Sequence, residues 1–222
     1  MKIVAVVSQK GGAGKTTLAV HLAVAAARAG YTVVVIDLDQ QATAAQWADW
    51  RTDDNVAVVA APHGRLLPTL EEARRNEVDL VIIDSPPAAD SAAVAAAKAA
   101  DLVLIPTRPS AFDLHAIKTT SELIKLARKP GFVVLNGVPP RASGLLEEVA
   151  AVVHSLELTL APVCLVDRAA FRHAVVNGQS AQEYEPGGKA AAEVESLYAW
   201  TCGQLDLSTR PVVYTSKRKA AA

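Results

Sequence analysis

The chain has 222 residues and a net charge of −1, and 51% of its residues are hydrophobic but only 5% aromatic. That length suits one large domain with a core of Ala, Val and Leu side chains, and the charge excludes a globally basic nucleic-acid-binding protein. The two cysteines, Cys164 and Cys202, form no C-x-x-C pair, so we expect two buried thiols in a reducing compartment. The N-terminal apolar run breaks at Ser8, too early for a signal peptide, and no stretch approaches the ~20 apolar residues of a membrane span. A cytoplasmic protein is expected.

Apolar, β-branched runs alternate with Ala- and Leu-rich helical patterns almost from end to end. The predicted strands are 2–7, 32–36, 56–60, 80–84, 102–106, 131–136 and 158–164. The predicted helices are 15–29, 43–51, 66–76, 90–99, 111–128, 143–155, 168–176 and 188–205. Strands that alternate with helices of about 10–18 residues indicate right-handed βαβ units. The expected fold is α/β, a mostly parallel twisted sheet of about seven or eight strands with helices on both faces.

One domain is expected over residues 1–207, because no repeat or linker divides them. Nothing precedes the first strand, so we expect no N-terminal helix-turn-helix domain. Residues 208–222 differ in composition and are expected to form a loosely ordered basic tail.

The segment Ser-Gln-Lys-Gly-Gly-Ala-Gly-Lys-Thr-Thr at positions 8–17 follows the first predicted strand and leads into a helix. That order is the context of a phosphate-binding loop. The glycines allow the backbone N–H groups to turn toward an anion, and the helix N-terminus adds its partial positive charge. Lys15 is placed to reach the β- and γ-phosphates, and the Thr16 hydroxyl is placed to ligate Mg²⁺. The predicted nucleotide-binding residues of this loop are Gly11, Gly12, Ala13, Gly14, Lys15, Thr16 and Thr17.

Carboxylates end two of the other predicted strands. Asp37 and Asp39 follow the second strand, and Asp84 ends the fourth. Ligands of a parallel sheet sit beyond the carboxyl ends of its strands, so these side chains are expected to face the phosphate loop. Asp84 has the form of a Walker B residue that holds the Mg²⁺ water shell. For Asp37 a turn-forming role stays equally open.

The loop departs from G-x-x-x-x-G-K-T, because Gln9 stands where the first glycine belongs and Lys10 adds a second lysine. In this it resembles the deviant Walker A motif K-G-G-x-G-K-T-T of the ParA/MinD group of P-loop ATPases. Gln9 before the first lysine is similar to the partition branch of that group. The resemblance implies a P-loop NTPase fold, ATP and Mg²⁺ as cofactors, and a homodimer when ATP is bound. It also implies that Lys10 reaches the nucleotide of the opposite subunit.

The same resemblance implies further roles at the site. Asp39 matches the second carboxylate of the family's D-x-D-P-Q segment, which orients the attacking water, while Gln40 departs from the family's proline. Pro86 completes the family's D-x-P pattern after Asp84, and Asn136 matches an asparagine that contacts adenine, near a loop over 162–167. The implied catalytic residues are Lys10, Lys15 and Asp39, and the implied metal site is Thr16, Asp39 and Asp84.

The similarity continues to about residue 205. It implies a cytoplasmic, nucleoid-associated ATPase whose ATP-bound dimer binds DNA non-specifically and positions a plasmid, chromosome or protein cluster. Its hydrolysis is expected to stay weak until DNA and a ParB-like or other adaptor protein stimulate it. The candidate DNA contacts are Arg168, Arg172, Lys189, Arg210, Lys217, Arg218 and Lys219. The sequence names neither cargo nor partner.

Three other functions are open at this stage. A MinD-like membrane ATPase needs an amphipathic C-terminal helix, but the basic cluster near Lys217 has no apolar face, so no stable membrane association is expected. An iron-protein relative of nitrogenase needs converging cysteines, and Cys164 and Cys202 lie far from the switch segments. A tyrosine-kinase-like relative would carry a tyrosine cluster in its tail, which this chain lacks.

Overall fold

The computed structural model describes residues 1–87 and 91–208. Its strands are β1 (Lys2–Val6), β2 (Val33–Asp37), β3 (Ala57–Ala60), β4 (Leu80–Asp84), β5 (Leu102–Thr107), β6 (Gly131–Val138), β7 (Thr159–Leu160) and β8 (Leu165–Val166). Its α-helices are α1 (Lys15–Arg28), α2 (Thr43–Asp49), α3 (Leu66–Arg75), α4 (Ser91–Ala99), α5 (Ala111–Ala127), α6 (Ser143–Ser155), α7 (Ala169–Val176), α8 (Ala181–Tyr184) and α9 (Lys189–Gln204). A short 3₁₀ helix, η1 (His63–Arg65), precedes α3.

The strands form a parallel sheet in the order β3-β2-β4-β1-β5-β6-β7, and β8 pairs with the end of β6. The register aligns Val6 with Asp84 and Asp84 with Asp37 across three neighbouring strands. The carboxyl ends of β1, β2 and β4 therefore meet at one edge of the sheet. The predicted α/β fold is confirmed.

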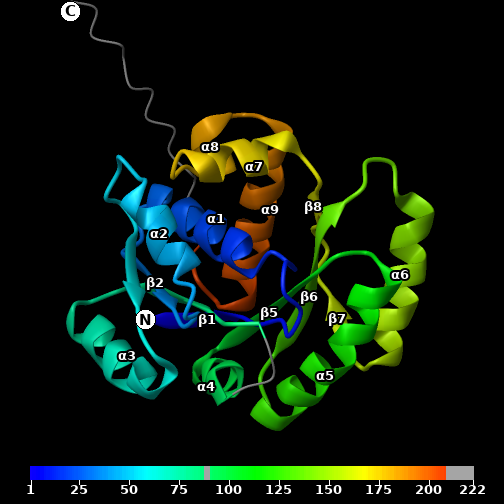
Figure 1. Cartoon of the computed structure of the whole chain (residues 1–222), viewed down its shortest axis with the longest axis horizontal. Coiled ribbons are helices and arrows are strands. Elements are labelled where there is room, and N and C mark those ends of the chain that lie inside the picture. Colours follow the sequence, from blue (N-terminus) through cyan, green and yellow to red (C-terminus); the bar gives the residue numbers. More distant parts are fainter. Residues whose placement is uncertain (88–90, 209–222) are drawn as a thin grey trace, which may run out of the picture.

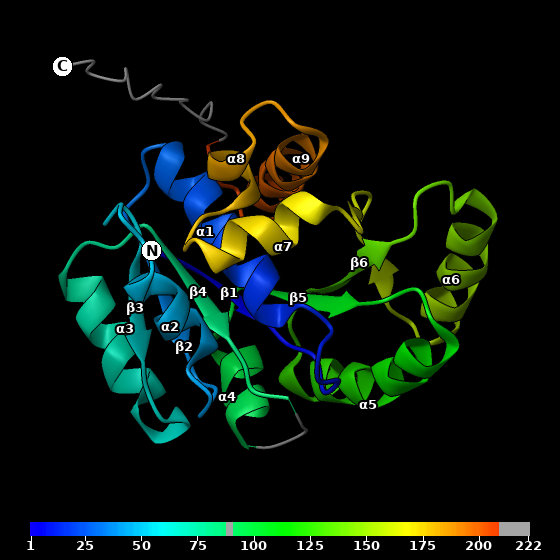
Figure 2. The ribbon, with the colours of Figure 1, turned by 45° about the horizontal axis from the view of Figure 1, so that its top comes forward.

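Helices cover both faces of the sheet (Figures 1 and 2). One apolar core lies between the sheet and α1, α2, α7, α8 and α9, and it contains Val4, Val6 and Val35. The other lies between the sheet and α3 to α6, and it contains Ala5 and Ile36. Successive side chains of a strand point to opposite faces, so strands buried on both faces must be apolar at every position. This explains the unbroken runs of Val and Ile that predicted these strands.

Most predicted elements agree with the structure to within two residues, but the region after α6 differs. Of the strand predicted over 158–164, only Thr159–Leu160 is a strand, β7; Pro162 follows it, and β8 begins one residue beyond the predicted range. Proline lacks an N–H donor, which interrupts a ladder at this point. The strand predicted to end at Asn136 continues through Gly137 to Val138. Helix α8 was not predicted; its four residues are held by a capping box between Ser180 and Glu183.

The cysteine expectation was correct for one residue. Cys202 is buried, whereas Cys164 is only half-buried. Among the described residues, no helix has the length and apolar character needed to cross a membrane. The tail predicted to be loosely ordered lies outside the described residues from position 209 onward.

Candidate nucleotide-binding site

The loop between β1 and α1 has the backbone of an anion cradle. Gly12 and Gly14 adopt φ of 73° and 94°, the left-handed region that favours glycine. A Cβ at Gly14 would lie 1.9 Å from Nδ2 of Asn136, so glycine is required there for space as well. Gly14 is also the N-cap of α1, and since glycine has no side chain, it makes no cap hydrogen bond to the first N–H groups of the helix. The first N–H groups of α1 are thus available to an anion.

Lys15 is buried at the base of this loop, with 7% of its surface exposed. Its Nζ donates a hydrogen bond to the carbonyl oxygen of Lys10, 3.2 Å away. Burial lowers the pKa of Lys15, while the charges of Asp84 and Asp39 oppose that shift. A desolvated ammonium next to a phosphate cradle is suited to hold a phosphate oxygen.

Thr16 and Asp84 meet at the same edge. The Thr16 hydroxyl donates to Oδ2 of Asp84 over 2.6 Å. Asp84 is 1% exposed, and desolvation raises its pKa to about 7, with the nearby charge of Asp37 acting in the same direction. Its Oδ1 is buried and has no hydrogen-bond partner among the described residues. A carboxylate in this state fits a cation, and Mg²⁺ is normally held by one or two such groups together with phosphates.

No group of three or more His, Cys, Asp and Glu side chains within the described ranges is arranged to hold a metal alone. The fit of Mg²⁺ to this site therefore depends on Thr16, Asp84 and the phosphates of a bound nucleotide.

The carboxylates after β2 have separate roles. Asp37 is buried and accepts hydrogen bonds from the N–H groups of Asp39, Ala44 and Ala45 at 3.0, 2.9 and 3.3 Å. Its side chain thereby caps the start of α2 and fixes the preceding turn. Burial raises the pKa of Asp37, and these hydrogen bonds oppose the shift. Of the two roles left open by the sequence, the structure supports the turn-forming one.

Asp39 is partly exposed and turns back on its own segment, since Oδ1 accepts from the N–H of Gln41 over 3.0 Å. Its charge acts on both Lys15 and Asp84. Gln40, at the position of the expected proline, is exposed. The structure thus brings Asp39 to the edge where Thr16 and Asp84 meet.

Lys10 extends from the loop toward α5. Its side chain is 43% exposed, and its Nζ lies 3.9 Å from Oδ1 of Asp113. Asp113 belongs to the first turn of α5, where its N–H donates to the hydroxyl of the N-cap Ser110. Lys10 is therefore near a carboxylate of its own chain, in a long and solvated contact of little energy.

Asn136 lies against the phosphate loop, where its Nδ2 donates to the carbonyl oxygen of Ala13 over 2.9 Å. It also lines a cavity of about 390 Å³ whose other walls are Thr17, Arg108, Gly137, Val166, Asp167, Arg168, Phe171 and Arg172. This cavity adjoins the phosphate loop through Thr17 and Asn136. Val166 and Asp167 belong to the loop expected to border the base.

Arg108 and Phe171 were not singled out from the sequence. Arg108 follows the end of β5, so its place at the carboxyl edge was a usable signal. Phe171 offered none, because α7 is brought to the cavity only by tertiary packing. Pro86, which the resemblance places among the nucleotide-binding residues, is buried just after β4.

The candidate DNA contacts differ in how available they are. Arg168 forms two hydrogen bonds to Oε1 of Glu193, at 2.8 and 2.6 Å. Arg172 pairs with Asp167. Lys189 is exposed at the start of α9. Arg210, Lys217, Arg218 and Lys219 lie outside the described residues.

A charged junction that the sequence did not reveal joins α2 to α8. The Arg51 guanidinium, on a side chain 4% exposed, donates to both oxygens of Glu183 and to the carbonyl oxygen of Gly178. It also lies 4.5 Å from the ring centre of Trp47. A Cβ at Gly178 would fall 2.4 Å from the backbone of Trp50, so glycine is needed for the close approach. The segment after Asp39 is thus fixed to the C-terminal third of the chain.

Comparison with known proteins agrees with this geometry. The family of the CobQ/CobB/MinD/ParA nucleotide binding domain matches residues 4–178. Maintenance of carboxysome distribution protein A from Gloeobacter kilaueensis is 34% identical over 212 residues, or 94% of this chain and 96% of that protein. The protein of the same name from Halothiobacillus neapolitanus is 32% identical over 198 residues, or 85% and 90%.

Among solved structures, the ATP complex of an Asp-to-Ala variant of Cyanothece McdA has a TM-score of 0.71 at 19% identity. It covers 94% of this chain and 98% of that one, which shows a common fold. The cradle, the buried lysine and the Thr16–Asp84 pair are consistent with ATP and Mg²⁺ as cofactors.

Proposed function

We propose that this chain is a cargo-positioning ATPase, because it belongs to the CobQ/CobB/MinD/ParA family and carries the deviant phosphate loop of that family's ParA/MinD ATPases. In its ATP-bound form two copies associate and bind DNA non-specifically. The observation that carries the proposal is the pair of lysines on one loop. Lys15 is buried in the phosphate loop, whereas the Lys10 side chain is 43% exposed and its ion pair within the described residues is a long one, 3.9 Å to Asp113.

The geometry supports a role for Lys10 outside its own chain. A contact to Asp113 at that distance is worth little in water, so a phosphate oxygen of a second copy is a stronger partner. Lys10 then completes the charge around the phosphates only in the dimer. Hydrolysis is slow in the monomer because stabilisation of the developing negative charge is incomplete.

In hydrolysis, Asp39 positions the attacking water and Lys15 holds the β- and γ-phosphates. Thr16 and Asp84 hold the cation, which supplies electrostatic stabilisation of the transferring phosphoryl group. Asp37 keeps the Asp39 segment in place through its three backbone hydrogen bonds. Positioning and charge are the main means by which an enzyme speeds phosphoryl transfer.

For the cargo, two relatives that each match more than four fifths of this chain carry the name of carboxysome distribution. We therefore propose a large protein body as the cargo class in preference to a plasmid, with an adaptor protein that stimulates hydrolysis. Of the candidate DNA contacts among the described residues, Lys189 lies exposed at the start of α9. We therefore assign the DNA contact to Lys189.

The first experiment separates catalysis from binding. Asp39→Ala is expected to bind ATP, fail to hydrolyse it and accumulate as a dimer in size-exclusion chromatography with light scattering. Asp49→Ala, at an exposed position of α2, is the matched control and should behave as wild type. Wild-type turnover by Asp39→Ala would show that Asp39 serves only the turn.

The second experiment tests the exposed lysine. Lys10→Ala should retain ATP binding as a monomer and lose both the ATP-dependent dimer and hydrolysis. Lys98→Ala removes an exposed lysine from α4, on the other face of the sheet, and should change neither. An unchanged dimer in Lys10→Ala would refute the role across subunits.

The third experiment concerns DNA. The ATP-bound Asp39→Ala dimer should bind DNA of any sequence and release it as salt rises from roughly 50 to 200 mM. Lys189→Glu should weaken binding without preventing dimerisation, and Lys98→Glu should not. Sedimentation with anionic liposomes in place of DNA would instead favour the membrane-associated alternative.

A further inference from the structure

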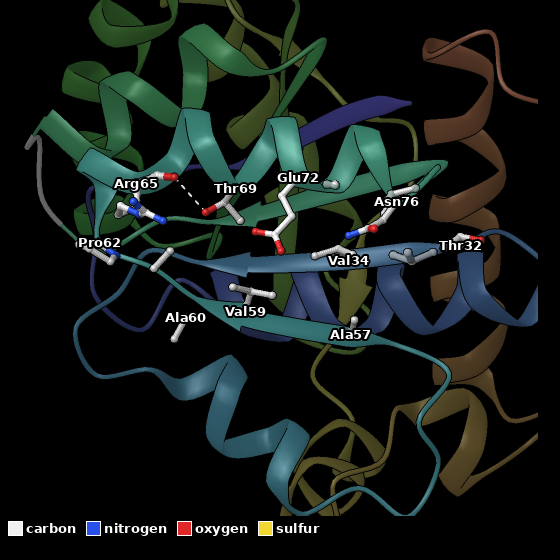
Figure 3. A pocket seen from close by; sticks show the side chains of 14 residues that line it. Thr32, Val34, Ala57, Val59, Ala60, Pro62, Arg65, Thr69, Glu72 and Asn76 are labelled. Carbon is white, nitrogen blue, oxygen red and sulfur yellow. Dashed lines mark hydrogen bonds between the residues drawn. The ribbon is translucent and has the colours of Figure 1, made fainter.

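A groove outside the nucleotide site lies between α3 and the edge of the sheet (Figure 3). Its volume is about 550 Å³. The floor is apolar and comes from strands β2 and β3, with Val34 and Val59 among its side chains. The wall is polar and comes from α3, where Thr69, Glu72 and Asn76 border the groove. Helix α3 thus leaves the last strand partly uncovered on this face, and Val59 is 40% exposed.

Strand β3, which forms one side of this groove, also has a free edge. Within the described residues it pairs on one side only, with β2, and it ends the strand order. The backbone N–H and C=O groups along its other side are therefore a template for a further strand. Residues 56–61 carry no charge, although soluble proteins commonly place charged side chains on such edges to prevent pairing with other chains. A free edge beside a groove for alternate side chains is an arrangement that binds extended peptides.

The charge in the groove indicates which side chain a bound segment would place there. Glu72 points from α3 toward β2 (Figure 3), and in the part of the chain that the structure describes its carboxylate forms no ion pair. The neighbouring Glu71, in contrast, is paired with Arg74. A lysine or arginine side chain fits both surfaces of the groove, because its aliphatic stem packs on apolar atoms while its charged end reaches a carboxylate.

We propose that the edge of β3 and this groove bind an extended segment of another protein. The segment pairs with β3 as an added strand, and its alternate side chains face the groove. One of these side chains is a lysine or arginine that lies on Val59 and pairs with Glu72. The inference concerns docking alone and does not depend on the ATPase proposal.

Charge distinguishes such a partner from a second copy of this chain. If two copies paired through β3, each groove would receive side chains of the other copy's β3. Residues 56–61 offer no cation to Glu72. The exposed Asp53 and Asp54, just ahead of β3, would bring further negative charge to the contact. A partner with a basic strand therefore matches the groove better than a second copy does.

Backbone and side-chain contacts join the groove to the two strands that carry the acidic residues of the nucleotide site. Ala61 lines the groove, and its N–H donates to the carbonyl oxygen of Asp37 over 2.9 Å. In η1, the His63 ring lies 3.1 Å from the hydroxyl of Ser91, the first residue of α4. A segment bound in the groove thus lies next to residues that contact the end of β2 and the helix after β4.

Two synthetic peptides test the charge preference. The probe acetyl-Thr-Val-Thr-Lys-Thr-Val-Thr-amide has its lysine and valines on one face of a strand, and the comparison peptide has glutamate in place of lysine. Wild type should bind the lysine peptide about tenfold more tightly, since the exchange replaces attraction to Glu72 by repulsion. Glu72→Lys should reverse this preference, whereas Glu71→Lys, the matched control on α3, should retain it. Chemical-shift titration measures the affinities.

Equal affinity of wild type for the two peptides would overturn the proposal, as would no binding of either at millimolar concentration.

Hydrogen exchange tests whether the peptide adds a strand. Saturation with the lysine peptide should slow exchange of the outward-facing amides of residues 57–60 about tenfold, in wild type and in Glu71→Lys alike. Unchanged exchange at saturation would show that the peptide occupies the groove without pairing with β3. Protection that rises with protein concentration in the absence of peptide would show that a second copy covers the edge. Either result would contradict docking of a partner strand.

Discussion

The nucleotide site and the junction between α2 and α8 both bury charged groups, but they satisfy them differently. At the junction, Arg51 has partners for its guanidinium on Glu183, Gly178 and Asn55. In the site, Asp84 keeps one buried oxygen without a partner among the described residues, and Lys15 contacts a carbonyl oxygen of its own loop. Removing one partner of a complete buried ion pair destabilises the fold, whereas a buried charge without a full set of partners lowers the stability of the free protein until a ligand arrives. The contrast separates structural from functional use of buried charge.

Breaking the junction should have the largest effect. Arg51→Met leaves Glu183 buried without its partner, which typically costs about 3–5 kcal/mol. For a domain of this size the melting temperature should fall by about 10 °C. Arg74→Met is the matched control, because the Arg74–Glu71 pair is 61% and 51% exposed and should contribute almost nothing. Differential scanning fluorimetry measures both, and similar melting temperatures would show that the junction is not structural.

Removing the incomplete charge should instead affect the ligand. Lys15→Ala should weaken ATP binding by about 3 kcal/mol, roughly a hundredfold, since the phosphates lose a desolvated partner. The nucleotide-free protein should lose little stability, because burial of the Lys15 ammonium is unfavourable and outweighs the charges of Asp84 and Asp39 that oppose it. Isothermal titration calorimetry with Mg-ATP and a melting curve without nucleotide test the two halves. A large drop in melting temperature would mean that Lys15 is a structural residue.

A third buried group, His21, allows the comparison to be tested through the pH dependence of folding stability. His21 in α1 is fully buried, and desolvation lowers its pKa to about 4. Its unfolded value is near 6.5, so the unfolded state binds the proton more readily between these two values. The contribution of His21 to stability should therefore fall as pH drops from about 6.5 to 4, by at most about 1.4 kcal/mol per pH unit. Urea unfolding should show this slope in the difference between wild type and His21→Leu, because Asp84 contributes an opposite slope to both chains.

The smallest effect is expected at Asp84. Its raised pKa means that the folded state retains a proton between about 4 and 7, so this residue lowers stability as pH rises through that window. Asp84→Asn should raise the melting temperature of the nucleotide-free protein at pH 8, by a stabilisation of about 1 kcal/mol. The same variant should lose Mg²⁺-dependent hydrolysis. A lower melting temperature would show that the Thr16 contact outweighs the burial of charge.

The fold and the phosphate site were predictable because their signals are local. Runs such as Leu80 to Asp84 must be apolar to be buried on both faces, and the loop to Thr17 needs glycines, lysine and threonine in a fixed order. The strand predicted over 158–164 was wrong because Pro162 interrupts it, a local signal given too little weight. Helix α8 has four residues, too few for a periodic pattern to predict.

By itself the sequence determined the order of the elements, the phosphate loop and the carboxylates at the strand ends, because each depends on neighbouring residues. Only the tertiary structure decided that Asp37 caps α2, that Gly14 makes room for Asn136, and that Arg51 meets Glu183. These contacts join residues between seven and 132 positions apart. Side chains so distant meet only when the sheet and its helices have packed, and periodicity along one segment carries no information about that meeting.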